Sequence, residues 1–375
     1  MSKTGTRTAP FRFDVVGSFL RPAELKEARA QHAKGELTAE ALKAVEDKAI
    51  RELVAKQHEA GLQVATDGEF RRSWWHLDFF WGLQGVEKTV SDSTNVFKGV
   101  ETRAESALLT ARISGEKHPF LEHFKFVQSI AAPGVAVRQT IPSPTQFLLH
   151  LVSPKNIENT SLFYPNKEEL IQDIVRAYKT VIADLYQLGC RNVQLDDCSW
   201  GQFFEGRSKA FNPDRSSDEE RKEEKLRVNN LVLDGRPEDL VITTHVCRGN
   251  FRSTWATFGG YEPVAEALFA REHVDALYLE YDSDRAGGFE PLRFVSKDKK
   301  VVLGLVTSKT PELESKEDII RRIHEAAQYV DLDRLHLSPQ CGFASTEEGN
   351  ILTEEEQWAK LRLIREISEE VWGSR

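Results

Sequence analysis

The chain has 375 residues, of which 50 are basic and 59 acidic, and its formal net charge at pH 7 is −9. The charges are spread along the sequence, which argues against nucleic acid or an anionic membrane surface as a partner. No apolar run approaches the roughly 18 residues of a transmembrane helix, and the first residues, MSKTGTRTAPFRF, lack a hydrophobic signal core. Four cysteines without short paired spacing indicate reduced thiols, so we expect a soluble cytoplasmic protein.

The first part of the chain predicts three strands and one long helix. Phe13–Phe19 is the first predicted strand and Gln63–Glu69 the second. The helix Thr38–Gly61 lies between them, because a capping threonine begins it and a glycine ends it. The charged and aromatic stretch from about 70 to 130 is interpreted as an elaborated loop with a short hairpin. Val135–Ile141 is the third strand.

The rest of the chain alternates between apolar runs and amphipathic stretches. The apolar runs predict five more strands: Asn192–Asp196, the run from Val241 that contains His245, Ala276–Glu280, Lys300–Val306 and Leu335–Cys341. The amphipathic stretches predict five helices: Lys167–Leu188, Ser216–Leu233, Tyr261–Arg271, Ser315–Val330 and Thr353–Trp372.

Eight strands separated by helices predict an α/β fold, the (β/α)₈ or TIM barrel, because parallel strands need crossover connections. Residues 1–375 are interpreted as one such domain, since α/β barrels of about 250 residues or more are common. A doubly wound sheet is the alternative, but it would not bring the first and last strands together. In a barrel, functional groups lie at the carboxyl ends of the strands.

Four side chains at such strand ends could bind a metal ion. His245 and Cys247 are two residues apart on one strand, so they point to the same face. Glu280 and Cys341 each end another predicted strand. Imidazole, thiolate and carboxylate groups suit Zn²⁺.

Each of these residues also has an ordinary explanation when it is taken alone, because a lone cysteine or histidine is usually a core residue. The shared position at strand ends favours a metal site. Structural zinc sites usually gather their ligands in tight Cys clusters. The scattered spacing here indicates a catalytic metal instead.

The order of short motifs along the chain resembles the cobalamin-independent methionine synthases. These motifs are Gly-Ser-Phe near the start, Asp-Gly-Glu, Gln-Leu-Asp, His-x-Cys, Leu-Glu and Ser-Pro-Gln-Cys-Gly. The similarity covers nearly the whole chain but only the C-terminal catalytic barrel of the long enzymes, so the chain resembles a short, single-barrel member. The resemblance implies transfer of a methyl group from a methyltetrahydrofolate-type donor to the thiol of homocysteine, which zinc activates, to give methionine.

The resemblance also implies roles for individual residues. The zinc ligands would be His245, Cys247, Glu280 and Cys341. The amino-acid part of homocysteine would be bound by Glu69 and Asp196 at its ammonium group and by Gly17 and Ser18 at its carboxylate. The Asp-Gly before Glu69 also suits a simple turn, and Ser18 also suits a cap. No catalytic residue beyond the zinc site is assigned.

Two departures from the long enzymes concern the methyl donor and proton transfer. The stretch Pro142–Leu149 after the third strand has no tryptophan, although that family lines its folate pocket with one there. The stretch Leu305–Lys309 after the seventh strand has no histidine, which in the family is associated with proton transfer. The donor could therefore be a folate, a methylated corrinoid protein or another electrophile, and the acceptor a related thiol.

Other features have a functional and a structural interpretation. The stretch Arg71–Trp81 could grip a flat anionic donor or could form a hydrophobic cluster under a long loop. Lys309 is interpreted as a solvated lysine at the rim, Cys190 as a core residue, and Cys198 as a residue near the site but outside the ligand pattern. The segment between the second and third predicted ligands, with Trp255 and a Gly-Gly pair, looks longer than in the long enzymes.

Two functions outside methionine synthesis are weighed against it. The first is zinc-dependent alkyl transfer to a thiol other than homocysteine, and the second is a non-catalytic zinc-binding barrel. Residues suited to binding an amino acid favour catalysis over the second. Hydrolysis by zinc-bound water is weaker still, because two thiolates make the metal a poor Lewis acid and no general base is evident.

Overall fold

The computed structural model describes residues 9–91, 96–97, 100–205 and 216–373. Its strands are β1 (Val64–Ala65), β2 (Gln84–Val90), β3 (Val96–Phe97), β4 (Val100–Glu101), β5 (Glu105–Ser114), β6 (Ala136–Val137), β7 (Gln139–Pro142), β8 (Asn192–Asp197), β9 (Val241–Val246), β10 (Ala276–Glu280), β11 (Lys300–Val306) and β12 (Leu335–Pro339).

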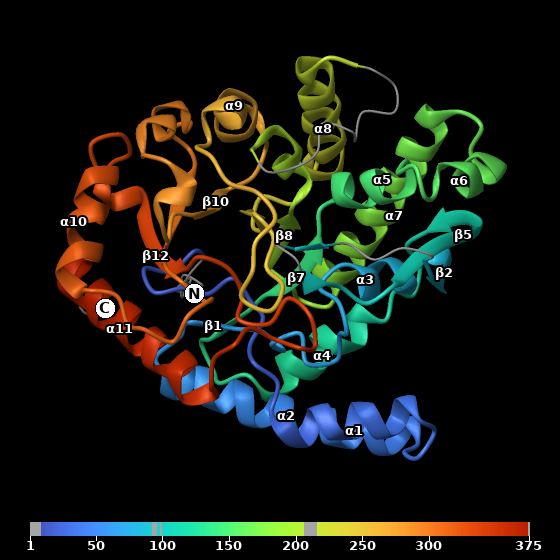
Figure 1. The fold of residues 1–375 in the computed structure, drawn as a ribbon, viewed down its shortest axis with the longest axis horizontal. Helices are drawn as coiled ribbons and strands as arrows, with labels where there is room; N and C mark the ends of the chain where they lie inside the picture. Colours follow the sequence, from blue (N-terminus) through green and yellow to red (C-terminus); the bar gives the residue numbers. More distant parts are fainter. Residues whose placement is uncertain (1–8, 92–95, 98–99, 206–215, 374–375) are drawn as a thin grey trace, which may run out of the picture.

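Helices surround the strands (Figure 1). They are α1 (Ala23–Ala33), α2 (Ala39–Glu59), α3 (Leu77–Gly82), α4 (Phe120–Ile130), α5 (Pro144–Leu151), α6 (Ile157–Phe163), α7 (Lys167–Gln187), α8 (Asp218–Leu233), α9 (Glu262–Ala265), α10 (Lys316–Ala326) and α11 (Glu354–Trp372), with short η1 (Ser199–Phe203), η2 (Glu266–Arg271), η3 (Asp284–Ala286), η4 (Glu290–Phe294) and η5 (Leu332–Arg334). Within the described ranges, none of the helices has both the length and the apolar character to cross a membrane.

The central strands close into the predicted barrel. Six of them form one parallel sheet in the order β12-β11-β10-β9-β8-β7. β1 pairs in parallel with β6, which lies just before β7. On the other side, Phe13 forms a parallel bridge with Leu337 of β12, and the Asp14 N–H donates to the Leu337 carbonyl at 3.0 Å. The hydrogen bonding therefore runs around the barrel from the first predicted strand to the last.

The first two predicted strands are much shorter than expected. Of Phe13–Phe19 only the bridge at Phe13 is regular, and of Gln63–Glu69 only β1 is. Side chains and turns replace the regular ladder here: the Thr66 hydroxyl donates to the Gly17 carbonyl at 2.6 Å, and the Phe19 N–H donates to the Gly68 carbonyl at 3.1 Å. These contacts keep the two segments adjacent without regular strand geometry.

The stretch from 70 to 130 contains the predicted hairpin, but it is more regular than expected. β2 and β5 form an antiparallel ribbon flanked by α3 and α4. Distant residues fix the ribbon, because the Leu109 N–H donates to the Asn159 amide oxygen at 2.9 Å and the Ile113 N–H donates to the Tyr164 hydroxyl at 2.7 Å. A local sequence pattern does not reveal such contacts.

The predicted long helices are confirmed. The Thr38 side chain caps α2 by accepting the Ala41 N–H at 3.2 Å, and α7, α8, α10 and α11 occupy the predicted ranges to within a few residues. The helix predicted over 261–271 is α9 followed by a π-helical turn, η2. These helices bury their apolar faces against the barrel, which fixes the strand ends relative to one another.

A buried ion pair ties the segment at Asp14 and the junction between β6 and β7 to β10 inside the barrel. The Arg138 guanidinium bonds to the Asp14 carboxylate at 2.9 and 3.1 Å and donates to the Tyr278 hydroxyl at 2.7 Å. Tyr278 in turn donates to Asp14 at 2.9 Å. All three side chains are buried, and the carboxylate beside Arg138 raises the pKa of the guanidinium despite its burial.

We predict that Arg138→Met lowers the free energy of unfolding by about 3–5 kcal/mol, because it leaves Asp14 buried without its cation. Urea denaturation followed by circular dichroism measures the change. The control is Arg293→Met, which breaks an exposed ion pair with Glu262 and should lower stability far less, because solvent screens exposed pairs. Equal losses in the two variants would contradict the role given to the buried pair.

Candidate metal centre and adjoining pocket

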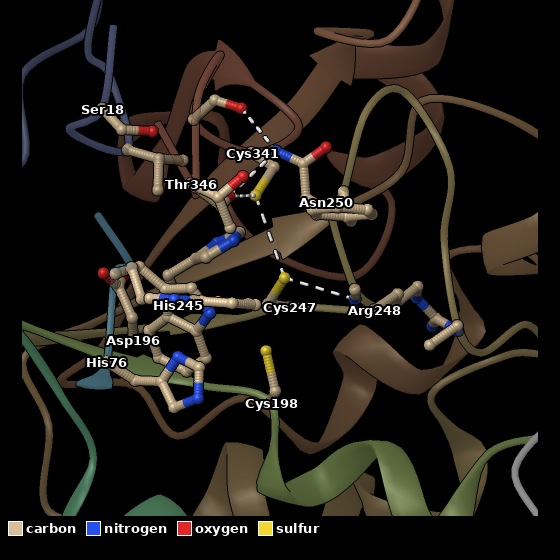
Figure 2. A pocket seen from close by; sticks show the side chains of 18 of the residues that line it. Ser18, His76, Asp196, Cys198, His245, Cys247, Arg248, Asn250, Cys341 and Thr346 are labelled. Atoms are coloured by element: carbon tan, nitrogen blue, oxygen red, sulfur yellow. Dashed lines mark hydrogen bonds between the residues drawn. The ribbon is translucent and has the colours of Figure 1, made fainter. Parts of the chain in front are cut away.

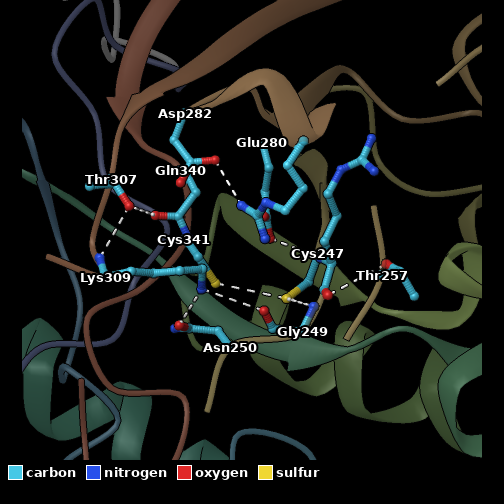
Figure 3. A network of polar contacts seen from close by, with 12 residues as sticks. Cys247, Gly249, Asn250, Thr257, Glu280, Asp282, Thr307, Lys309, Gln340 and Cys341 are labelled. Atoms are coloured by element: carbon cyan, nitrogen blue, oxygen red, sulfur yellow. Dashed lines mark hydrogen bonds and ion pairs between the residues drawn. The ribbon is translucent and has the colours of Figure 1, made fainter. Parts of the chain in front are cut away.

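The four predicted metal ligands lie together at the carboxyl ends of the strands. His245 is in β9, Cys247 follows it, Glu280 ends β10, and Cys341 follows β12. One ligand atom from each lies within 4.8 Å of the ligand atoms of the others, and all four residues are buried. Figures 2 and 3 show the cysteine sulfurs facing each other.

The geometry of this group fits a tetrahedral metal ion. The two sulfurs are 3.8 Å apart and both cysteines are free, so they form no disulfide. Two thiolates about 2.3 Å from one tetrahedral zinc are separated by about 3.8 Å. Neither ring nitrogen of the buried His245 has a partner with good hydrogen-bond geometry among the described residues, although the ring lies near the Cys341 sulfur and the Tyr278 backbone. An imidazole with both nitrogens unsatisfied in the interior is costly unless it binds something.

The surroundings of the two thiols favour their neutral form unless a cation is bound. Contact with Cys247 and burial raise the pKa of the Cys341 thiol well above its ordinary value. Contact with the half-buried Cys198 is the main cause that raises the pKa of the Cys247 thiol. A bound metal ion reverses this tendency, because it favours the thiolate form of its ligands.

A cavity of about 150 Å³ adjoins the metal group. Its lining includes Ser18, Glu69 and Asp196 as well as His245, Cys247 and Cys341 (Figure 2). Three of the four residues predicted to bind substrate therefore lie beside the candidate ligands. The fourth, Gly17, does not line the cavity. A Cβ at Gly17 would lie 2.7 Å from the Thr140 methyl carbon, so its small size lets the first segment pack closely.

The two carboxylates of the cavity are buried, and Glu69 forms an ion pair with the buried Arg72. Burial raises the pKa of Glu69 to about 7, and it does the same for Asp196. One Glu69 oxygen accepts from Arg72 at 3.1 Å and from the Thr140 hydroxyl at 2.9 Å. The other oxygen, Oε2, has no partner in the described ranges, and Glu69 itself adopts a positive φ of 62°. A strained, buried and partly unpaired carboxylate indicates a binding function.

Two interpretations made from the sequence change at this site. Lys309 is 5% exposed, so the prediction of a solvated rim lysine is wrong. Its ammonium donates to the Asn250 side chain at 2.7 Å (Figure 3), because the loop after β9 folds over it. The aromatic stretch after Glu69 divides: Trp74, Trp75 and His76 line the cavity, while Arg71 forms ion pairs with α2.

Sequence reasoning included His76 in the stretch that could grip a donor, but it missed Gln146 and Asn250. His76 lines the cavity, and burial lowers its pKa to about 3, so its ring is neutral. Gln146 and Asn250 also line it. His76 and Asn250 come from loops and Gln146 comes from the first turn of α5, so only their position shortly after predicted strands could have suggested them.

Fold and site together define a TIM barrel with a buried His, Cys, Glu and Cys group suited to a metal ion, next to an acidic pocket. The family model described as the catalytic domain of cobalamin-independent synthases matches residues 11–370. The chain belongs to this family, which supports a methyltransferase.

Individual proteins and structures are similar to this chain over most of its length. The uncharacterized protein YxjH of Bacillus subtilis is 49% identical over 369 residues, which are 98% of this chain and 96% of YxjH. A structure from Listeria monocytogenes, described as that of a proposed vitamin B12-independent methionine synthase, is 36% identical with a TM-score of 0.77 and covers 98% of this chain and 100% of its own. A B12-independent methionine synthase from Shewanella, solved with selenomethionine, is 20% identical with a TM-score of 0.72 over 97% of this chain and 98% of its own, which supports the TIM-barrel fold.

We predict that Cys341→Ser binds zinc at least 10-fold more weakly, because a hydroxyl does not replace a thiolate ligand. Metal content after dialysis against a weak chelator measures this. The control is Cys190→Ala, because Cys190 is a buried cysteine whose thiol donates to the Asn192 carbonyl at the opposite end of β8. Full zinc retention by Cys341→Ser would remove Cys341 from the ligand set.

Proposed function

We propose that this protein is a zinc-dependent methyltransferase that moves a methyl group to the thiol of homocysteine and so forms methionine. The adjacency of two groups in one cavity carries this proposal. The cavity is lined by the metal-binding side chains His245, Cys247 and Cys341 and by the carboxylates of Glu69 and Asp196. It is thus equipped for a thiol at one end and an ammonium group at the other, as in a thiol amino acid.

Zinc is the proposed metal, with His245, Cys247, Glu280 and Cys341 as its ligands. When bound, it would hold an incoming thiol as the nucleophilic thiolate at neutral pH. Backbone N–H groups of the protein orient two of the ligands: that of Gly249 donates to the Cys247 sulfur at 3.3 Å, and that of Arg248 to Glu280 at 2.8 Å. Such contacts normally support metal affinity.

The other end of the substrate is proposed to bind at the acidic side of the cavity. Glu69 and Asp196 would accept the ammonium group, and the free Oε2 of Glu69 suits this role. The Ser18 hydroxyl accepts the Ala344 N–H at 3.2 Å, which leaves its own proton to donate to the substrate carboxylate. Gly17 would contribute backbone only. Both ends together would fix the sulfur near the metal ligands.

In the proposed reaction a sulfur–carbon bond forms, and the bond between the methyl group and the donor breaks with its electron pair left on the donor. With a folate donor, the donor nitrogen takes up a proton, which balances the proton that the thiol loses. A methyltetrahydrofolate-type donor is favoured, and a methylated corrinoid protein is the alternative. Trp74, Trp75 and His76 give the cavity an aromatic wall against which a flat donor could stack. Alkyl transfer to a different thiol and a non-catalytic zinc barrel are the competing functions.

The test uses purified, zinc-loaded protein with homocysteine and either methyltetrahydrofolate or a methylcorrinoid. We expect methionine from one of the two donors, and the donor that yields methionine is the one that the protein uses. If homocysteine binds but neither donor reacts, the electrophile is a different one. If homocysteine does not bind, the acceptor has been assigned wrongly, and a protein that binds zinc but no thiol would indicate a non-catalytic barrel.

We predict that affinity for methionine rises by about 10-fold between pH 6 and pH 8, if one carboxyl with a pKa near 7 must ionise to bind the ammonium group. Burial raises the pKa of both Glu69 and Asp196 to about 7, so both are largely protonated and neutral at pH 6. Methionine is the probe because it has no thiol proton. Calorimetry at several pH values measures the slope.

Glu69→Gln should weaken methionine binding and flatten this dependence, whereas the exposed control Glu262→Gln should leave both unchanged. Binding that weakens as the pH rises would contradict the proposed role of the carboxylates.

A further inference from the structure

The carboxylate of Glu280 differs from the other candidate ligands because a cation already holds it. Its Oε2 accepts a hydrogen bond from Arg285 Nη2 at 3.1 Å, and its Oε1 accepts the Arg248 N–H at 2.8 Å. The side chains of Glu280 and Arg285 are 0% and 7% exposed, respectively. His245, Cys247 and Cys341 have no ion pair with a cation among the described residues. Glu280 is therefore the ligand for which the metal must compete.

The position of Arg285 is itself well supported. Its guanidinium donates to Asp282 at 2.8 Å and lies 4.9 Å from the centre of the Trp255 ring. Its carbonyl accepts the Gly259 N–H at 2.8 Å. Trp255 and Gly259 belong to the long segment between Cys247 and Glu280, so this segment helps to position the Arg285 side chain.

Arg285 also has spare hydrogen-bonding capacity. Its Nη1 is buried and has no partner within the part of the chain that the structure describes. Nη2 alone serves both Glu280 and Asp282. A guanidinium can bind one carboxylate through two nitrogens at once, so Arg285 can hold Glu280 more firmly than it does here.

We propose that Arg285 is a positioning residue that takes up the Glu280 carboxylate when a thiol substrate replaces it at the metal. This inference rests on the proposed function. An anionic thiolate that enters a buried site displaces an equal charge, and a free buried carboxylate is costly without a cation. Arg285 supplies that cation next to the ligand, so exchange of the two anions requires only a short movement of Glu280.

The test compares zinc affinity with thiol affinity in Arg285→Met, which keeps an unbranched apolar side chain but removes the charge. We expect zinc to bind this variant at least as tightly as the unchanged protein, because nothing then competes for Glu280. Thiols should bind the zinc-loaded variant on the order of 10-fold more weakly, because the displaced carboxylate has no partner. Arg285→Lys should restore most of the thiol affinity, and Arg293→Met is the surface control.

Two measurements separate these effects. Competition with a chromophoric chelator gives zinc affinity, and the visible absorption of the cobalt-substituted protein reports thiol binding at the metal. An Arg285 that merely orients Glu280 would instead cost 10- to 100-fold in metal affinity when it is replaced and leave the thiol affinity of the loaded protein unchanged. That outcome would overturn the inference.

The inference and the proposed function fail in distinguishable ways. Homocysteine and 2-mercaptoethanol are titrated in parallel, because mercaptoethanol has a thiol but no amino-acid group. If only mercaptoethanol perturbs the cobalt spectrum, the acceptor is assigned wrongly, and the Arg285 comparison still proceeds with mercaptoethanol. If neither thiol reaches the metal, both fail. If Arg285→Met does not fold, Asp282→Asn tests the same point with opposite signs. Arg285 is then freer to bind Glu280, so we expect this variant to bind zinc more weakly and thiols more tightly.

Discussion

The register between parallel strands determines the geometry of the whole site. In the ladders of the barrel, Asp196 of β8 lies opposite His245 of β9, and His245 lies opposite Tyr278 of β10. Because the strands are parallel and the barrel closes, their carboxyl ends meet at one mouth. Residues that are far apart in sequence thus reach one cavity, mainly through backbone hydrogen bonds between strands. Closure through Phe13 and Leu337 brings the last strand, and with it Cys341, into the same group.

Much of this arrangement could be predicted from sequence. A strand has a period of two, so His245 and Cys247 had to share a face, and Glu280 and Cys341 had to lie at comparable strand ends. The same logic brought Glu69 and Asp196 to the cavity. The first two strands were predicted too long, because Thr66 and the turn at Gly68 replace the ladder there, and side-chain substitution for backbone pairing has no periodic signature.

Loops account for the rest of what the sequence did not reveal. The burial of Lys309 depends on Asn250, which lies in another loop, and the ion pair of Glu280 with Arg285 depends on a turn stabilised by Gly259. These contacts join segments whose relative positions follow only from the closed barrel. The residues at the strand ends could therefore be predicted from the sequence pattern, whereas the loop residues that pair with charged groups of the site could not. Burial raises the pKa of the acidic groups in the cavity, Glu69 and Asp196. A buried cation, Arg285, lies next to the candidate ligand Glu280, which is consistent with the proposed exchange of a carboxylate for a thiolate.

The spacing of the two candidate cysteine ligands has a consequence for folding. Cys247 and Cys341 are separated by 94 positions. Three strands of the barrel, β10, β11 and β12, lie between them in the sequence. A metal ion that joins their sulfurs would act as a removable cross-link over a long loop, and such links gain stability from the chain entropy that they remove. Metal binding would then be coupled to completion of the barrel. A chain truncated before its last strand would lack Cys341 and therefore the metal-mediated cross-link. Metal binding would then distinguish full-length, folded molecules from incomplete ones.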